Sequence, residues 1–398
     1  MRAIILALLL AGCTRGESGE REPSPNTPRQ IHARLLTLDT HLDTPLMFAR
    51  QGWDFGAWHS FEVDSSQVDL PRMAEGGLDG GFFVIWTRQG ELTPSAYRAA
   101  LTHALKRQDA IRRAIGANGK QIELATASGD AERLSGAGKA FAYQAIENSY
   151  PLGTNLENLA RFYKLGVRMA GPVHSKNNQF ADSGTDVARY GGLSPLGRNW
   201  IAEMNRLGMV IDGSHASDAA LEQMIALSKT PVILSHSGPD AMFEHGRNIP
   251  DDLMRKLAAS GGVMQINTLY LEPLYSNAKT DALMNRKGGL EFQTPEEQAE
   301  TLRQVRALAG EEPPRGAATF DMFMASLLHA LKIMGPQHVG LGADWDGGGG
   351  VAGLMDVAAL PKITERLIAA GYTEADLEKI WSGNALRLLR QAEAVRAR

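Results

Sequence analysis

Short apolar runs alternate with amphipathic stretches of helical periodicity along most of the chain. Such runs are typical of buried strands. Eight of them are predicted strands: one within Leu35–Pro45, then Gly80–Trp86, Ala140–Ile146, Gly166–Ala170, Gly208–Asp212, Pro231–Ser235, Gly262–Asn267 and His338–Gly342. A shorter strand is predicted at Gln121–Ala125. The stretches between them include the predicted helices Pro94–Ile115, Leu196–Leu207, Asp218–Leu227 and Asp251–Ala259.

This alternation predicts the α/β fold class. Strands that alternate with helices form right-handed βαβ units and a parallel sheet, and eight such strands favour a closed (β/α)8 barrel of the TIM type. An open doubly wound sheet is the alternative, but no GxGxxG turn follows the first predicted strand. The 398 residues are enough for one large barrel.

The connection Leu269–Phe320 is long and carries clusters of Gly, Pro and charged residues around one helical piece, Pro295–Leu308. In a barrel it lies on the side where the strands end, which makes it a candidate lid or substrate wall. A solvated insertion or an oligomer contact is the alternative.

The N-terminal residues predict export. One arginine, an apolar run too short to span a bilayer and small residues before Cys13 form a secretory signal. The stretch L-A-G-C resembles the lipobox of bacterial lipoproteins, which implies that Cys13 becomes the lipidated first residue; a plain cleaved signal is the alternative. Thr14–Gln30 is rich in Pro, Ser, Gly and charge and is a predicted tether.

The predicted organisation is therefore a signal over residues 1–13, a tether over 14–30 and a single barrel domain over 31–398. Lipoproteins that stay in the inner membrane have a retention aspartate after the cysteine, and this chain has Thr14 there. By analogy, the chain is predicted to be anchored in the outer membrane, facing the periplasm. The net charge of −4, without a basic stripe, argues against nucleic-acid binding. Cys13 is the only cysteine, so stability must come from core packing and metal.

Seven polar side chains lie at or just past the ends of separate predicted strands. In a parallel barrel those ends open onto one rim, so residues far apart in sequence meet in one cavity. The seven are His41, Asp43, Glu147, His174, His215, His236 and Asp344. The other histidines, His245 among them, lie in helices, in loops or ahead of strands.

The chemistry of this set favours metal over nucleophilic serine. His41 and Asp43 are two residues apart and therefore point the same way from an extended chain. The set holds too many imidazole and carboxylate groups for one tetrahedral zinc and suits two metals that share a bridging carboxylate. No G-x-S-x-G is present, and Ser235 beside His236 lacks a nucleophile turn.

At these motifs the chain resembles the membrane (renal) dipeptidases, zinc enzymes of the amidohydrolase barrel type. The resemblance runs from about Ile31 to Leu389. It rests on D-x-H-x-D, R-L-G-M-V-I-D-G-S-H, P-V-I-L-S-H-S, R-N-I-P-D-D, H-V-G-L-G-A-D-W-D-G and W-S-G-N-A-L-R.

The resemblance implies two zinc ions per chain and a role for each matched residue. His41 and Asp43 would hold the first zinc, Glu147 would bridge, and the second would be held by His215 and His236. His174 would polarise the scissile carbonyl, Arg247 would grip the substrate carboxylate, and the proton would be shuttled by Asp344. The implied reaction is hydrolysis of L-Xaa-L-Xaa dipeptides by a metal-bridging hydroxide, with L-Xaa-D-Xaa as a second class, and the implied assembly is a homodimer.

The chain departs from the family pattern in two places. Asn148, Ser149 and Tyr150 stand where glycines usually follow the bridging glutamate, which leaves the substrate preference near the amino end open. The family tyrosine after I-N has no clear match, since Tyr270 is shifted. Two rival functions remain: hydrolysis of a β-lactam, lactone or phosphotriester on the same scaffold, and a non-catalytic binding lipoprotein of the envelope.

Overall fold

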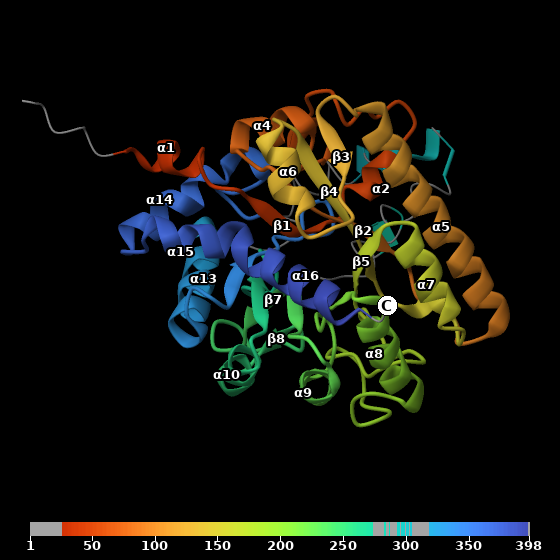
Figure 1. Cartoon of the computed structure of the whole chain (residues 1–398). Helices are drawn as coiled ribbons and strands as arrows, with labels where there is room; N and C mark the ends of the chain where they lie inside the picture. The colour runs from red at the N-terminus through yellow and green to blue at the C-terminus, as the bar shows by residue number, and fades with distance from the viewer. Residues whose placement is uncertain are drawn as a thin grey trace, which may run out of the picture.

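Parallel strands form the centre of the molecule, and helices surround them (Figure 1). The computed structural model describes residues 26–273 and 318–396, with a few isolated residues between 282 and 304. The central strands are β1 (Leu38–Leu42), β2 (Gly80–Trp86), β4 (Ala140–Glu147), β5 (Val167–Ala170), β6 (Val210–Ile211), β7 (Ile233–Pro239), β9 (Val263–Ile266) and β10 (Val339–Leu341). Each contains or overlaps one of the eight predicted strands.

Two parallel sheets join to close the barrel. One has the order β1-β2-β4-β5-β6, and the other has the order β10-β9-β7-β8, where β8 is Asn248–Ile249. Single parallel bridges connect them, from Asp212 to Ile233 on one side and from Leu42 to Trp345 on the other. The resulting circuit confirms the predicted (β/α)8 barrel. The extra strand β3 (Ile122–Leu124) pairs with β4, as predicted for Gln121–Ala125.

The predicted helices form with nearly the expected bounds. They are α5 (Pro94–Ala117), α8 (Pro195–Leu207), α9 (Asp218–Leu227) and α10 (Asp251–Ala259). Three of them begin where a hydroxyl caps the first turn: Thr93, Ser194 and Ser217 each accept a hydrogen bond from the backbone N–H three residues on. Further helices of the outer layer are α7 (Glu157–Lys164), α13 (Phe320–Met334) and α14 (Pro361–Ala369).

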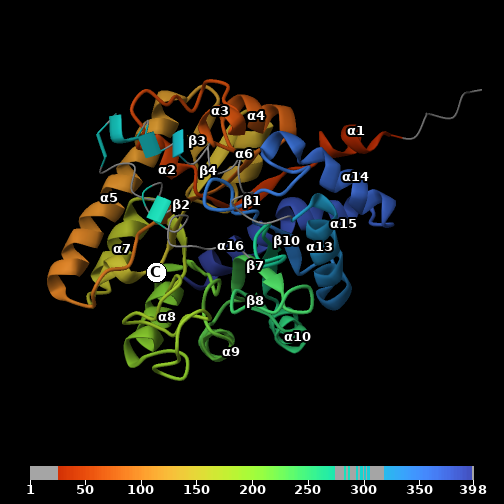
Figure 2. The same ribbon diagram turned by 180° about the vertical axis from the view of Figure 1, so that it is seen from behind.

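The C-terminal helix α16 (Asn384–Val395) closes the end of the barrel where the strands begin. Its apolar side chains belong to one cluster with residues at the starts of several strands, including Leu38, Val210, Ile233 and Val263. Figure 2 shows the barrel from behind, with β7, β8 and β10 beside α10 and α13. Because α16 fills the end where the strands begin, we expect the functional site at the opposite rim, where the strands end.

The N-terminal helix α1 (Pro28–His32) begins three residues before the predicted start of the domain at Ile31. It is part of the fold, because His32 Nδ1 lies 2.7 Å from the hydroxyl of Thr364 on α14. Residues 1–25, with Cys13 and most of the predicted tether, lie outside the described residues, as does most of the Leu269–Phe320 connection. Among the described helices, none is both long enough and apolar enough to cross a bilayer.

Candidate active site

The strands bring all seven predicted side chains to the same rim. Asp43 follows β1, Glu147 is the last residue of β4, and His174 and Asp344 lie a few residues past β5 and β10. His236 was predicted just past a strand but lies within β7. That strand is longer than expected because Gly238 and Pro239 pair with β8, a two-residue strand that the apolar pattern did not predict.

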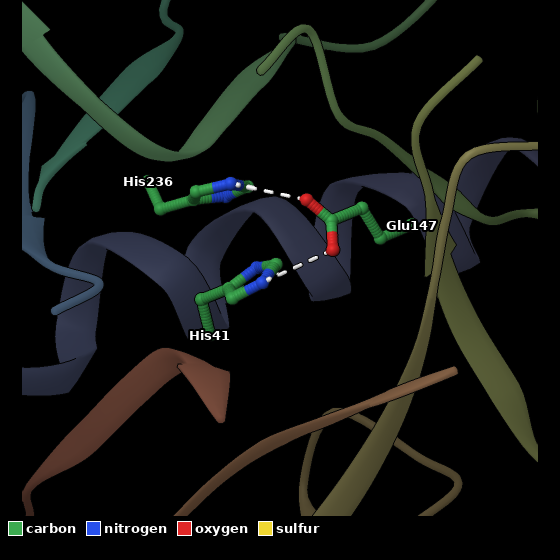
Figure 3. Close-up of side chains that lie close together, drawn as sticks. All are labelled: His41, Glu147 and His236. Atoms are coloured by element: carbon green, nitrogen blue, oxygen red, sulfur yellow. Dashed lines mark ion pairs between the residues drawn. The ribbon is translucent and has the colours of Figure 1, made fainter. Parts of the chain in front are cut away.

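Glu147 lies at the centre of the cluster. One carboxylate oxygen, Oε2, is 3.5 Å from His41 Nε2, and the other, Oε1, is 2.7 Å from His215 Nε2 and 3.3 Å from His236 Nε2. Figure 3 shows the carboxylate between the imidazoles of His41 and His236, with one oxygen directed at each. The two oxygens therefore face different nitrogen ligands, which is the geometry expected of a bridging carboxylate.

Asp43 and Asp344 lie on the His41 side of the cluster. His41 Nε2 is 3.5 Å from Asp43 Oδ2, so the two side chains share a face as the H-x-D spacing predicted. The same nitrogen is 3.9 Å from Asp344 Oδ1. His41, Asp43 and Asp344 each offer an atom within 4.8 Å of the others. A cation held by His41 and Asp43 would therefore lie on the opposite side of Glu147 from His215, with Asp344 beside it.

Burial and charge set the protonation of this cluster. Burial lowers the pKa of both His215 and His236 well below the ordinary histidine value, so both imidazoles are neutral near pH 7 and keep a lone pair. Burial alone would raise the pKa of Glu147. The positive charge of His41, that of His174 when this ring is protonated, and the hydrogen bonds to His215 and His236 outweigh burial, and the pKa of Glu147 falls well below its ordinary value.

A hydrogen-bonded relay orients His236. Its Nδ1 lies 2.8 Å from Ser235 Oγ, and this hydroxyl donates to Asp212 Oδ2 at 2.5 Å. Because the hydroxyl hydrogen goes to Asp212, Ser235 Oγ accepts from Nδ1–H of His236. The ring is therefore held in the tautomer that leaves Nε2 free for a ligand.

Three further predicted residues surround the cluster. His174 is the most exposed, with 31% of its side chain accessible, and its Nε2 is 3.8 Å from Glu147 Oε1. Arg247 directly precedes β8, is 3% exposed and donates from Nη2 to the backbone oxygen of His236 at 2.9 Å. Asp344 is 9% exposed. The site is thus buried beneath His174, with a guanidinium along one wall.

Unusual backbone conformations gather here. Asn148, His215, Tyr270 and Asp344 have φ values of 66°, 67°, 56° and 65°. Side-chain-bearing residues rarely adopt this left-handed region, and such strain is found mainly at functional sites. The fold therefore bends the chain after four strands, β4, β6, β9 and β10, where the site residues lie.

The residues that depart from the family pattern anchor the loop after β4. Asn148 Nδ2 donates to the backbone oxygen of Thr87, and Ser149 Oγ donates to that of Gly171. Tyr150 is buried, and its hydroxyl donates to the backbone oxygen of Glu91. These three polar side chains thus hold the end of β4 in place.

The sequence pattern missed two aromatic residues at the site. Tyr270 stacks on His245, with ring centroids 4.4 Å apart and an interplanar angle of 17°. The guanidinium carbon of Arg247 lies 5.5 Å from the centroid of the Tyr270 ring. Only the aromatic residue after I-N hinted at this arrangement, since stacking depends on loop geometry that periodicity does not reveal.

The donor set fits divalent metal ions. His41 Nε2 and Asp43 Oδ1 are buried and have no hydrogen-bond partner among the described residues. The facing nitrogens of His215 and His236 are 2.9 Å apart, and both rings are neutral near pH 7. The carboxylates of Asp43 and Glu147 and the lone pairs of these two neutral imidazoles therefore converge in a buried site, which is costly unless a cation is shared between them.

Comparisons with known proteins agree with this geometry. Residues 26–398 match the family described as membrane dipeptidase, peptidase family M19. The dipeptidase tcpJ of Claviceps purpurea is 29% identical over 356 residues, covering 86% of this chain and 75% of the relative. Dipeptidase 3 of Macaca fascicularis is 31% identical over 337 residues, covering 83% of this chain and 59% of the relative.

A solved structure agrees as well. The probable dipeptidase PvdM from Pseudomonas aeruginosa matches with a TM-score of 0.78 and 30% identity, over 92% of this chain and 98% of that chain. The family match spans nearly all of the chain and includes every side chain of the cluster. The chain therefore belongs to the membrane dipeptidase family, peptidase family M19, and is a dipeptidase-type metallohydrolase.

Proposed function

We propose that this chain is a dinuclear zinc dipeptidase that cuts the single peptide bond of dipeptides with a free carboxylate. The observation that carries the proposal is the Glu147 carboxylate, which lies between His41 on one side and His215 and His236 on the other. His41 and Asp43 would hold one zinc and His215 and His236 the second, with Glu147 shared. When bound, the metals would acidify a water molecule and polarise the scissile carbonyl.

Arg247 would bind the substrate carboxylate. Its side chain is almost fully buried, its Nε has no hydrogen-bond partner, and no Asp or Glu of the described residues forms an ion pair with it. A buried cation without a counter-charge is unfavourable, whereas a guanidinium binds a carboxylate with two parallel hydrogen bonds. This requirement limits substrates to those with a carboxylate one residue past the cleaved bond.

His174 would stabilise the oxygen of the cleaved carbonyl. Ser175 Oγ lies 2.9 Å from His174 Nδ1 and can donate to it, which leaves the hydrogen on Nε2 toward the site. Burial and the charge of Arg247 lower the pKa of His174, although Glu147 opposes them. A neutral imidazole in this tautomer donates a hydrogen bond to the oxygen as negative charge develops.

Asp344 would move the proton. Its carboxylate lies 3.9 Å from His41 Nε2, next to the position proposed for the first zinc. We expect it to accept a proton from the attacking water and pass it to the leaving amine. Asp344→Asn should therefore lower kcat by about 10² to 10⁴ and leave metal content unchanged.

The activity is tested by metal removal and a substrate panel. Chelation should abolish hydrolysis of L-Ala-L-Ala, and added zinc should restore it. L-Ala-D-Ala, a β-lactam, a lactone and a phosphotriester belong in the same panel, with His41→Ala as the inactive control. Faster turnover of the non-peptide substrates would contradict the dipeptidase proposal, and tight peptide binding without hydrolysis or metal would favour a binding lipoprotein.

We also propose that the chain is anchored to the periplasmic face of the outer membrane through a lipid on Cys13. The support is the L-A-G-C sequence and the tether that follows it.

By resemblance we further propose a homodimer. Light scattering of residues 26–398, produced without the signal and lipid anchor, should give the mass of two chains.

A further inference from the structure

The side chain of Arg247 has few fixed contacts for a buried guanidinium. Nη2 donates a hydrogen bond to the backbone oxygen of His236, and the Tyr270 hydroxyl lies close enough to interact with the guanidinium. Nε has no hydrogen-bond partner, although the residue is 3% exposed. Two-point binding of a carboxylate needs the plane of the guanidinium to be fixed, so another group has to orient it.

The ring of Tyr270 faces this guanidinium. The distance of 5.5 Å from the guanidinium carbon to the ring centroid is within the range of cation–π contacts. The backbone of Tyr270 is held in the left-handed region, with φ 56°, and its oxygen accepts a hydrogen bond from Asn248 Nδ2 at 2.9 Å. These constraints place the ring beside Arg247.

His245 contacts both members of this pair. Its ring is nearly parallel to that of Tyr270, with centroids 4.4 Å apart. Its Nδ1 accepts a hydrogen bond from the backbone N–H of Arg247 at 3.1 Å. The imidazole therefore braces the aromatic ring that faces the guanidinium and also fixes the backbone that carries it.

We propose that His245 is a positioning residue that, together with Tyr270, orients Arg247 and thereby sets the preference of the site for substrates with a free carboxylate. The inference rests on the proposed binding of the substrate carboxylate by Arg247. His245 lies beside Arg247 in a loop and does not reach the metal cluster. Its loss should thus weaken recognition of the carboxylate and spare the chemical step.

The test compares a dipeptide with its C-terminal amide. The zinc-loaded full chain is assayed with L-Ala-L-Ala and with L-alanyl-L-alaninamide, and the ratio of the two kcat/KM values is the readout. We expect a wild-type ratio of about a hundredfold in favour of the acid, because the amide leaves the buried charge of Arg247 unpaired. His245→Ala should lower this ratio about tenfold through a higher KM for the acid, with the amide unaffected.

Two further variants sharpen the test. His245→Phe keeps the stack on Tyr270 but has no acceptor for the Arg247 N–H, so its ratio should fall between those of wild type and His245→Ala. If His245→Ala does not fold, the ratio of His245→Phe is compared with that of wild type instead. His329→Ala is the matched control, because His329 is a partly exposed histidine that pairs with Asp251 on the outside of the barrel.

The possible failures are distinguishable. A wild-type enzyme that cleaves acid and amide equally well would overturn the proposed role of Arg247, and the role of His245 with it. If wild type prefers the acid and both folded His245 variants keep the same preference, the positioning role of His245 is overturned, and the role of Arg247 stands. An equal loss of activity on acid and amide would indicate a general structural defect and would also overturn it.

Discussion

Single residues around the metal cluster act mainly by fixing the orientation of the groups that do the chemistry. Ser235 is the clearest case. Its hydroxyl donates a hydrogen bond to Asp212 and accepts one from Nδ1–H of His236, so the imidazole is fixed in orientation. Ser235→Ala should lower zinc affinity about 10- to 100-fold. Competition with a chromophoric chelator measures this directly, and an unchanged affinity would show that Ser235 Oγ does not orient the ligand.

The titration of His245 should affect substrate binding. Burial and the charge of Arg247 lower the pKa of His245, and Asp240 opposes them. The ring is therefore neutral at pH 7 and gains a proton only as the pH falls below the ordinary histidine value. A protonated Nδ1 would face the Arg247 N–H and add a second positive charge, so KM for the dipeptide should rise on acidification.

The control for this prediction is the His245→Phe variant. The charged groups around His245 are Asp240, Glu244 and Arg247, and a cavity that it borders is lined by Asp182, Asp186 and Asp218. His245→Phe removes the imidazole and leaves these groups in place. An acidic rise in KM that persists unchanged in this variant would assign the effect to the carboxylates or the metal ligands.

At the level of elements, the loop after β10 packs directly against the metal cluster. A side chain at Gly347 would overlap with Asp43 Oδ2 and Asp344 Oδ1. Gly347→Ala should therefore displace both carboxylates and reduce kcat/KM about a hundredfold, with reduced zinc content. Gly116→Ala is the control, because Gly116 lies in α5 with open space around its Cβ position, and alanine there should raise the melting temperature slightly.

The strands of the barrel were predictable because each is a short apolar run between helical stretches. β8 was not, since Asn248–Ile249 is only two residues long and exists through its pairing with β7. That pairing extends β7 past His236, so the sequence placed the histidine beyond a strand that in fact contains it. Periodicity reports local burial and does not report pairing between distant segments.

The same distinction applies to the site. The seven rim residues were predictable because a parallel barrel brings all strand ends together. The stack of Tyr270 on His245 was not, because it depends on the loops that follow β7 and β9. Neither was the Asp212 to Ser235 hydrogen bond, which depends on the register between neighbouring strands.

For the whole molecule, the barrel separates stability from function at its two ends. α16 and the apolar residues at the strand starts fill one end, and the polar cluster occupies the other. The proposed lipid on Cys13 adds attachment to a membrane. Cys13→Ser should move the protein from the membrane fraction to the soluble fraction, as measured by fractionation, with kcat/KM of the folded domain unchanged. Retention of the variant in membranes would contradict the anchor.

The most direct test of the central claim measures zinc content per chain together with dipeptide turnover in the same preparations. We predict about two zinc ions per wild-type chain, turnover that falls in step with metal on chelation, and loss of both in Glu147→Ala, since its carboxylate is shared between the two positions. Metal-free wild-type protein that still hydrolyses L-Ala-L-Ala, or Glu147→Ala protein that keeps both zinc ions and full turnover, would contradict it.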